Sequence, residues 1–196
     1  MGKERGNEFM SKEILHRGKR LLLRRAVEGD LDFILRLEYA PENVSFIVPF
    51  DRTFHEPILR GEARGTMDII VEECATGEPV GYVLANGLQS VAKEIEWTHI
   101  IVAKKGLGYG HETLKLLKAW AFEDLQFHRA WLDCKPYNRR ALHLYESEGM
   151  VLEGRFRETI VTNGVYEDLV VLALLAREYE AMKQAGIELE SPQQKA

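Results

Sequence analysis

The sequence predicts a single α/β (α+β) domain: a mixed, mostly antiparallel sheet of about seven strands with a central parallel pair, flanked by about four to five helices. Three observations predict this class. Apolar, β-branched runs of strand length recur along the chain. Short turns join most neighbouring runs, which favours antiparallel hairpins. One amphipathic helix separates two runs in the second half of the chain, and such a crossover makes the two strands parallel.

Length and composition suit one globular domain. At 196 residues the chain can bury a core, and 45% apolar and 29% charged residues are ordinary proportions for a globular protein. The net charge of −5 argues weakly against a nucleic-acid surface and is compatible with a cationic substrate. No apolar run is long enough to span a membrane, and the first residues lack the apolar region of a secretory signal.

The two cysteines, Cys74 and Cys134, have neither CxxC nor Cys/His metal spacing, so we expect reduced, mostly buried thiols in a cytoplasmic protein. We expect no metal ion, no nucleic-acid or membrane partner, and a monomer or homodimer. Residues 1–12 are expected to be disordered or derived from cloning, residues 13–182 to form the domain, and residues 183–196 to be a polar, mobile tail.

The first third of the chain predicts one strand and one or two short helices. Lys19–Ala26 is the expected first strand, its leucines bounded by arginines. Asp30 is a suitable N-cap for a short helix through Leu37. Prolines interrupt residues 41–66, where one short helix near Pro57–Ala63 fits. This stretch either shapes a substrate site or is a connecting loop.

Three strands follow with short turns between them, so we expect an antiparallel meander. They are predicted at Met67–Cys74, Val80–Leu88 and Ala92–Val102. Gly81 is expected to mark a bulge or a close approach of backbones. Asn86-Gly87 is an alternative turn that would shorten the second of these strands.

A predicted crossover comes next. The helix His111–Leu125 has apolar side chains at intervals of three and four. The strand Arg129–Cys134 follows it and should lie parallel to Ala92–Val102. A second helix is expected from Asn138, its N-cap, to Glu148.

The chain ends with a hairpin and a helix. Asn163-Gly164 predicts a type I′ turn between strands at Met150–Arg157 and Val165–Leu175. A short helix, Ala176–Met182, is expected before the polar tail.

Three alternate glycines, Gly106, Gly108 and Gly110, separate the strand ending at Val102 from the helix starting at His111. Glycines let a backbone approach a ligand closely, and the first turn of a helix offers unpaired N–H groups at its positive dipole end. The pattern is neither the Rossmann fingerprint nor a Walker A loop. It predicts a phosphate-binding loop of another kind.

Two segments together resemble the GCN5-related N-acetyltransferases (GNATs). Lys105–Gly110 is similar to the family's Gln/Arg-x-x-Gly-x-Gly/Ala signature, and Asn138–Met150 is similar to its Asn-x-x-Ala-x-x-Leu-Tyr-Glu segment. Val151–Glu158, with Asn163-Gly164 and Asp168, resembles the ending of the ribosomal-protein-alanine acetyltransferase branch.

The resemblance covers residues 19–180 and departs from the family in two places. Lysine stands at position 105, where Gln or Arg is usual. The link from Val102 to Lys105 is about two residues short, which leaves open the register of the preceding strand.

The resemblance implies transfer of an acetyl group from acetyl-coenzyme A to a primary amine, by direct attack in a ternary complex. The amine would belong to a protein N-terminus or to a small molecule. The central parallel pair would splay apart to admit the pantetheine arm of the coenzyme, which would run along Ile101, Val102 and Ala103. A backbone N–H near Val102 or Ala103 would stabilise the oxygen that becomes negatively charged.

The resemblance also assigns the remaining coenzyme contacts. The pyrophosphate would bind the backbone amides of Lys105, Gly106, Leu107, Gly108, Tyr109, Gly110 and His111, with added charge from Lys104 or Lys105. Asn138, Ala141 and Tyr145 share one face of the second helix and would contact the coenzyme. The Tyr145 hydroxyl would lie near the sulfur, where a phenol can protonate the departing thiolate.

The general base has several candidates. An amine arrives protonated and must lose a proton before it attacks. Glu96 matches a glutamate position of several family members, and Glu94 replaces it if the register is shifted by two. Asp133 matches another such position, and a water chain is a further alternative. His99 is either a helper in the cleft or a strand histidine satisfied by its neighbours.

Two rival functions remain open from sequence alone. One is a non-catalytic acyl-coenzyme A binding or sensing module of the same fold. The other is a nucleotide-binding protein that uses the glycine loop for another phosphate. Neither cysteine lies at a predicted helix N-terminus, so a covalent route through a thiol has no support.

Overall fold

The computed structural model describes residues 12–186 of the chain, so the expectations for residues 1–11 and 187–196 lie outside the described residues. The strands are β1 (Ile14–Arg17), β2 (Leu21–Arg25), β3 (Thr66–Glu73), β4 (Pro79–Asn86), β5 (Glu94–Val102), β6 (Arg129–Cys134), β7 (Val151–Thr162) and β8 (Val165–Leu175). The α-helices are α1 (Leu31–Glu38), α2 (Pro41–Val44), α3 (Arg52–Leu59), α4 (Tyr109–Ala119), α5 (Arg139–Ser147) and α6 (Ala176–Gln184).

The strands form one sheet in the order β1-β2-β3-β4-β5-β6-β8-β7. Every neighbouring pair is antiparallel except β5 and β6, which are parallel. The predicted fold class and the predicted parallel pair are therefore confirmed. The sheet has eight strands rather than seven, because Ile14–Arg17 adds an edge strand that pairs with β2.

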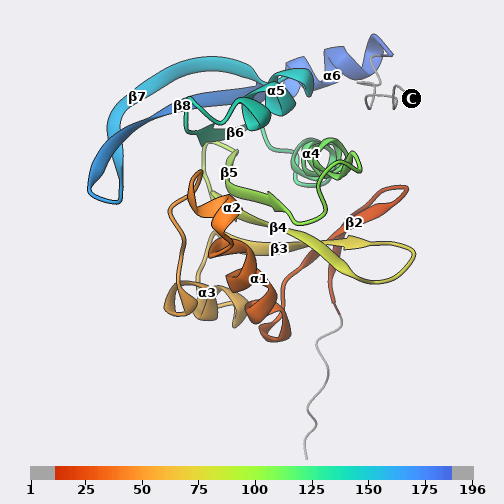
Figure 1. Ribbon diagram of the computed structural model, residues 1–196. Coiled ribbons are helices and arrows are strands. Elements are labelled where there is room, and N and C mark those ends of the chain that lie inside the picture. The colour runs from red at the N-terminus through yellow and green to blue at the C-terminus, as the bar shows by residue number, and fades with distance from the viewer. Residues whose placement is uncertain (1–11, 187–196) are drawn as a thin grey trace, which may run out of the picture.

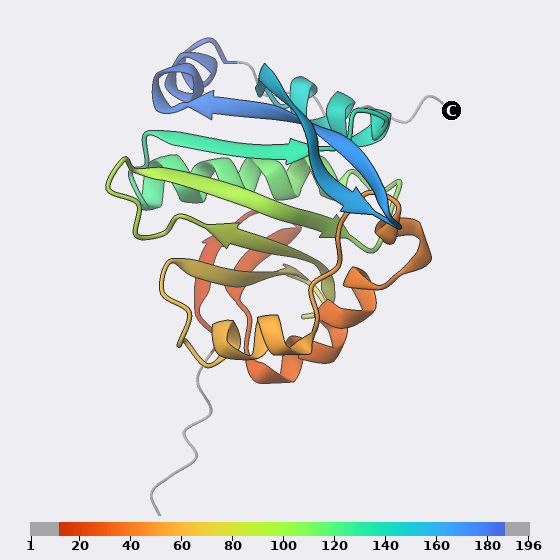
Figure 2. The same cartoon turned by 90° about the vertical axis from the view of Figure 1, so that its left-hand side faces the viewer.

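Helices cover both faces of the sheet (Figures 1 and 2). Figure 2 shows α4 behind the strands, and α1 and α3 lie on the opposite face. The core has two parts accordingly. Trp97 and Leu117 belong to the larger cluster, under α4, whereas Ile34, Ile58 and Ile101 belong to the smaller one, under α1 and α3.

The parallel pair is splayed, as expected. β5 and β6 pair only over Glu94–Glu96 and Arg129–Trp131, although both strands continue beyond this point. β5 stays paired with β4 as far as Val102, and β6 stays paired with β8 throughout. A gap therefore opens between the two central strands at their carboxyl ends.

A bulge at Thr98 changes the direction of the side chains along β5. Leu84 pairs with His99 and Ala85 pairs with Trp97, so one extra residue is accommodated in β5. Trp97 packs under α4, but Ile101 packs under α1 and α3. Glu96 and His99 consequently lie on the same face of the sheet, the one covered by α1 and α3.

Gly81 is a close-approach point, as predicted. A Cβ atom at this position would lie 2.6 Å from the carbonyl oxygen of Ile101. The neighbouring register shift between β3 and β4 is the expected bulge. β4 ends at Asn86, so the shorter alternative for this strand is the correct one.

The first part of the chain holds two corrections. Asp30 occupies the N-cap position of α1 but makes no side-chain cap bond, because its carboxylate binds Arg24 and the N–H of Val27. The helix expected at Pro57–Ala63 is wrong. α3 begins at Arg52, because Asp51 accepts a hydrogen bond from the N–H of Phe54, and Pro57 lies inside it.

The second half follows the prediction closely. α4 begins at Tyr109, and a π-helical segment, Trp120–Asp124 (η2), completes the helix expected to reach Leu125. Asn138 caps α5 by accepting from the N–H of Ala141, as predicted. α6 continues to Gln184, so the expected tail starts later than residue 183.

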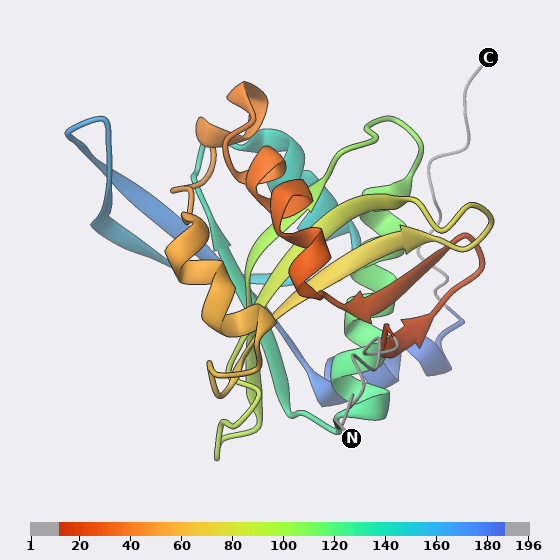
Figure 3. The same cartoon turned by 90° about the horizontal axis from the view of Figure 1, so that it is seen from below.

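The β7–β8 hairpin turns at Asn163-Gly164, and both residues have positive φ, as a type I′ turn requires. β7 is longer than predicted and contains a register shift between Phe156 and Ile160. Figure 3 shows this hairpin projecting beyond the rest of the molecule. No helix within residues 12–186 has the length and apolar character needed to cross a membrane.

A buried charge cluster fixes α1 to the sheet. Arg24 is 1% exposed, and its guanidinium contacts Asp30 at 2.7 Å and Glu72 at 2.6 Å. We predict that Arg24→Met lowers the free energy of unfolding by about 3 kcal/mol, because it leaves two buried carboxylates without their cation. Urea unfolding followed by circular dichroism measures this.

The neighbouring Arg25→Met is the matched control. Arg25 has a 38% exposed side chain and contacts Glu13 at 3.5 Å, so its removal should cost less than about 1 kcal/mol. If Arg24→Met and Arg25→Met lost the same free energy of unfolding, the assigned role of Arg24 would be contradicted.

Candidate active site

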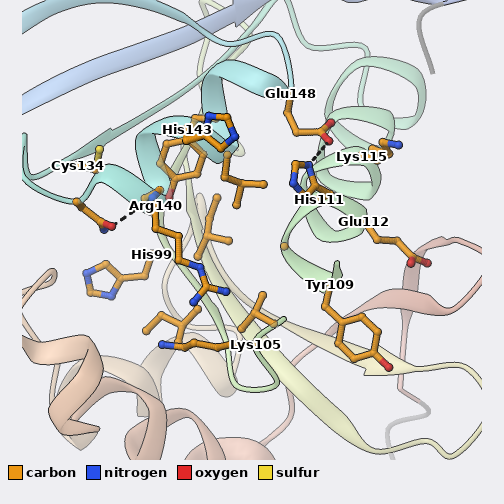
Figure 4. Close-up of a pocket in the computed structure, with 18 of the residues that line it drawn as sticks. His99, Lys105, Tyr109, His111, Glu112, Lys115, Cys134, Arg140, His143 and Glu148 are labelled. Carbon is orange, nitrogen blue, oxygen red and sulfur yellow. Dashed lines mark hydrogen bonds and ion pairs between the residues drawn. The ribbon is translucent and has the colours of Figure 1, made fainter. Parts of the chain in front are cut away.

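A cavity of about 1690 Å³ lies along the gap between β5 and β6. Its wall includes the carboxyl ends of both strands, the glycine loop, one face of α5 and the segment after α2 (Figure 4). The predicted site residues on this wall are Ile101, Val102, Lys105, Gly106, Leu107, Gly108, Tyr109, Gly110, His111, Asp133, Asn138, Ala141 and Tyr145. Ala103 and Glu96 are not on the wall.

The glycine loop leaves a helix N-terminus open to a ligand. Gly106 and Gly108 have φ values of 83° and 75°, a conformation that side chains with a Cβ atom rarely adopt. Gly108 is the N-cap residue of α4 and supplies no side-chain acceptor. The N–H groups of the first turn are therefore available, and the helix dipole favours an anion there.

Arg20 holds this loop against β2. Its Nη1 donates to the carbonyl oxygen of Leu107 at 3.0 Å, and its Nε donates to Glu112 at 2.7 Å. The guanidinium also lies over the Tyr109 ring at 5.1 Å. The loop is thus fixed before any ligand binds. In the sequence Arg20 is only a charged residue at the start of a predicted strand, so this role could not be predicted.

The two lysines before the loop differ in position. Lys104 donates to Glu78 at 2.7 Å and lies 3.5 Å from Glu73, so these acids already neutralise it. Lys105 donates to the side-chain oxygen of Asn43 at 3.4 Å. Of the two predicted cations, Lys105 is the better placed for a phosphate. Figure 4 shows Arg140 extending from α5 toward the same loop.

Tyr145 lies on α5 at the inner end of the cavity. Burial raises the pKa of its phenol, and the charge of Asp133 raises it further. A phenol with a raised pKa stays protonated at neutral pH and can donate a proton. Burial also raises the pKa of Cys134 to about 12, so this thiol is not an activated nucleophile.

Two of the predicted carboxylates, Asp133 and Glu96, influence each other near the gap. Asp133 lies on β6 beyond the last residue paired with β5, and burial together with the charge of Glu96 raises its pKa to about 6. Burial likewise raises the pKa of Glu96. Glu94 instead lies 3.9 Å from Arg129 at the paired end of the strands. The structure therefore brings Glu96, and not Glu94, close to Asp133.

The two candidate oxyanion donors are not equivalent. The N–H of Ala103 donates to the carbonyl oxygen of Val80 at 2.8 Å, so it is not free to bind a ligand. Backbone groups alternate in direction along an antiparallel strand, so the N–H of Val102 points away from β4, toward the gap. Val102 is the donor that the sheet leaves available.

His99, which the sequence left open as a helper in the cleft or a satisfied strand histidine, lies on this wall. Its side chain is 7% exposed and lines the cavity, and its Nδ1 lies 2.7 Å from Glu38 of α1. Among residues 12–186, no group of three or more His, Cys, Asp or Glu side chains is placed to hold a metal ion.

Comparison with known proteins identifies the family. Residues 20–151 match the family model described as an acetyltransferase (GNAT) domain. This match covers more than half of the chain, which therefore belongs to the GNAT acetyltransferase family. The protein transfers an acetyl group from acetyl-coenzyme A to an amine, as the sequence resemblance implied, and the non-catalytic binding module is not favoured.

Two curated relatives have names that mention different acceptors. The Bacillus subtilis protein named "Putative ribosomal N-acetyltransferase YdaF" is 29% identical over 135 residues, which cover 67% of this chain and 74% of that protein. The spermidine N(1)-acetyltransferase of Vibrio cholerae is 28% identical over 110 residues, which cover 56% of this chain and 64% of that protein.

Solved structures agree with the fold. A spermidine N-acetyltransferase from Vibrio cholerae, in complex with CoA and spermine, superposes with a TM-score of 0.73 at 24% identity, covering 83% of this chain and 99% of that one. A GCN5-related N-acetyltransferase from Brucella melitensis gives 0.73 at 20% identity, covering 92% and 86%.

The glycine loop yields a direct test of coenzyme binding. We predict that Gly108→Val weakens coenzyme A affinity at least about tenfold, because a branched side chain at positive φ distorts the loop and crowds the helix N-terminus. Calorimetric titration with coenzyme A measures this. Gly77→Val is the control, since Gly77 has a similar φ of 71° in the turn between β3 and β4. Undiminished affinity in the Gly108 variant would show that the loop does not bind the coenzyme.

Asp133 yields a pH-dependent stability prediction. Its pKa of about 6 lies above the ordinary value of 3.8, so the fold disfavours the ionised form and loses stability as pH rises through 6. Asp133→Asn removes this loss and should raise the free energy of unfolding by roughly 2 kcal/mol at pH 8, with little change at pH 4.

Urea unfolding at the two pH values measures the effect. Asp32→Asn is the control, because the Asp32 side chain is 79% exposed and should show no such difference. A stabilisation that is equal at both pH values would rule out ionisation of Asp133 as its cause.

Proposed function

We propose that the protein acetylates a small, positively charged primary amine by direct attack on acetyl-coenzyme A in a ternary complex. The observation that carries this proposal is the gap between β5 and β6, which has the Tyr145 phenol toward one side of the sheet and Asp133 toward the other. Such a passage lets two substrates approach from opposite faces. Their reacting atoms can then meet without a covalent enzyme intermediate.

The coenzyme would occupy the side of the sheet that α4 covers. The amides of residues 105–111 would bind the pyrophosphate at the N-terminus of α4, with Lys105 adding positive charge. The pantetheine arm would run along Ile101, Val102 and Ala103 in the gap, and Asn138 and Ala141 would contact it from α5. The side-chain oxygen of Asn138 caps α5, so its amide N–H groups are the ones left for this contact.

The acceptor would enter from the side that α1 and α3 cover. Asp133, whose pKa is raised, lies on the cavity wall, and Glu96 lies near it outside the wall, so the entrance has an acidic character that suits an ammonium group. The segment after α2 narrows this entrance, because the carbonyl oxygen of Ser45 accepts from Tyr137 at 3.0 Å and from Lys135 at 3.2 Å. A narrowed acidic entrance favours a small cationic amine over the surface of a folded protein.

The residues have separable roles in the transfer. The acidic site holds the ammonium and accepts its proton, with Asp133 and Glu96 as the groups that the sequence proposed for this step. The N–H of Val102 stabilises the oxygen that gains negative charge. Tyr145 donates its phenolic proton to the departing thiolate.

A panel of amines tests the proposed acceptor. Spermidine, spermine and a peptide with an N-terminal alanine would be compared by the release of coenzyme A thiol at equal concentration. We expect the polyamines to be the better acceptors, because this chain is similar to the spermidine N(1)-acetyltransferases of Vibrio cholerae and Escherichia coli. Turnover of the peptide and not of the polyamines would reject a small cationic acceptor.

Tyr145 provides a test of the proton donor. We predict that Tyr145→Phe lowers kcat by roughly 10- to 1000-fold with little change in coenzyme A affinity, because the phenyl ring keeps the packing and loses the proton. Steady-state kinetics and calorimetry measure the two quantities. Tyr166→Phe is the control, since Tyr166 is 67% exposed on the β7–β8 hairpin. An unchanged kcat in the Tyr145 variant would remove the phenol from the mechanism.

A further inference from the structure

We propose that His99, oriented by Glu38, is the base that takes the proton from the acceptor ammonium, while Asp133 holds that cation and the nearby Glu96 adds negative charge. The inference rests on the proposed function and assigns one of its steps to another residue. His99 replaces the carboxylates of Asp133 and Glu96 as the proton acceptor, and these carboxylates keep their role in attracting the ammonium group. The argument begins with the contacts of Glu38.

Glu38, at the last position of α1, is a completely buried carboxylate that receives three hydrogen bonds. Tyr82 donates its hydroxyl to Oε1 at 2.5 Å, His99 Nδ1 lies 2.7 Å from the same oxygen, and the N–H of Phe50 donates to Oε2 at 3.3 Å. Oε1 accepts from Tyr82 and Oε2 accepts from Phe50, so this carboxyl group serves as an acceptor on both oxygens. Nδ1 of His99 therefore carries a hydrogen and donates it to Glu38.

This arrangement fixes the state of the other ring nitrogen. In a neutral imidazole with a protonated Nδ1, Nε2 has a free lone pair and accepts a proton. Among residues 12–186, the structure gives Nε2 of His99 no hydrogen-bond partner, and the residue lines the cavity. Figure 4 shows the His99 ring on the side of the pocket away from Tyr109 and Glu112, with the Lys105 side chain drawn below it.

The surroundings suit a base that gains a charge during the reaction. The titratable groups that face His99 or its partner are Glu38 from α1, His55 from α3, Asp68 from β3, Tyr82 from β4, Glu96 from β5 and Asp133 from β6. Four of these six groups are carboxylic acids, so acidic side chains predominate around the ring. The Phe50 ring, 5.1 Å from the imidazole, restricts its movement.

The proton transfer balances without any other reactant. An N–H bond of the ammonium breaks, an H–Nε2 bond forms on His99, and the electron pair stays on the amine nitrogen. This nitrogen then forms the amide bond while the carbon–sulfur bond of the thioester breaks. The imidazolium keeps its bond to Glu38 and afterwards loses the proton to water. Glu38 acts through His99 and is therefore a positioning residue.

The chain contains a matched comparison for this pair. His55 is also a buried histidine bound to a carboxylate, with Nδ1 2.9 Å from Asp68. Its side chain is completely buried and absent from the cavity wall, and its Nε2 has no hydrogen-bond partner, although it lies 3.9 Å from Oε1 of Glu38. A purely structural role for such pairs would make substitutions at His55 and His99 similar in effect. If His99 is the base, a substitution at His99 should lower kcat far more than the same substitution at His55.

The experiment compares His99→Gln, Glu38→Gln and His55→Gln by pH–rate profiles with the best amine, together with coenzyme A affinity. We expect His99→Gln to lower kcat at least about 100-fold near neutral pH and to remove the acidic limb, with coenzyme A affinity unchanged. Glu38→Gln should shift this limb, and His55→Gln should leave it in place. Free imidazole should restore part of the activity of His99→Ala.

Two outcomes would overturn the proposal. One is a His99→Gln enzyme within about threefold of the parent while Asp133→Asn loses the acidic limb, which would make Asp133 the base. The other comes from ¹⁵N NMR of the unmodified protein at pH 8, which needs no variant to fold: a hydrogen on Nε2 rather than Nδ1 excludes His99 as the acceptor. If no amine is turned over although coenzyme A binds, the proposed function fails instead, and the tautomer measurement still stands.

Discussion

The separation of β5 from β6 is the constraint on which the rest of the site depends. Each strand keeps its outer neighbour, because β5 follows β4 as far as Val102 and β6 follows β8 as far as Cys134. Gly81 makes the first of these pairings possible, since a side chain there would collide with the carbonyl group of Ile101. The two central strands are no longer paired beyond Glu96 and Trp131, and the cavity lies in the gap between them.

The two faces of the sheet are built differently around this gap. On the side of α4, apolar packing and the anchored glycine loop create a preformed site for an anion. The opposite side contains buried polar groups at an unusual density, with Arg24 and Asp30 at one end of α1 and Glu38 at the other. Burying such groups is costly unless every partner is present. The network therefore holds α1 in one position and fixes the part of the cavity wall that His99 forms.

Local patterns predicted much of this architecture. The turn at Asn163-Gly164, the cap at Asn138 and the crossover between β5 and β6 each depend on residues close together in the chain. The edge strand β1 is short and pairs only on one side, so its sequence carries little signal. The bulge at Thr98 depends on pairing with β4. Alternation along the sequence could therefore not show that Glu96 and His99 share a face.

Contacts between distant residues escaped prediction for the same reason. Arg20 holds a loop 87 positions away, and Glu38 orients a histidine 61 positions away. Composition and spacing do not reveal such pairs. The family resemblance supplied Tyr145 and Asp133 because both lie in recognisable motifs or positions, whereas Glu38 lies at the end of an ordinary amphipathic helix.

The central claim is that coenzyme A binds with its pyrophosphate at the glycine loop and its pantetheine arm in the gap between β5 and β6. A crystal structure of the protein with coenzyme A bound tests this most directly. The account predicts that the pyrophosphate contacts the amides of residues 106–111 and that the sulfur lies in the gap, within hydrogen-bonding distance of the Tyr145 hydroxyl. A coenzyme whose arm lies outside the gap, or whose pyrophosphate is bound away from the glycine loop, would contradict it.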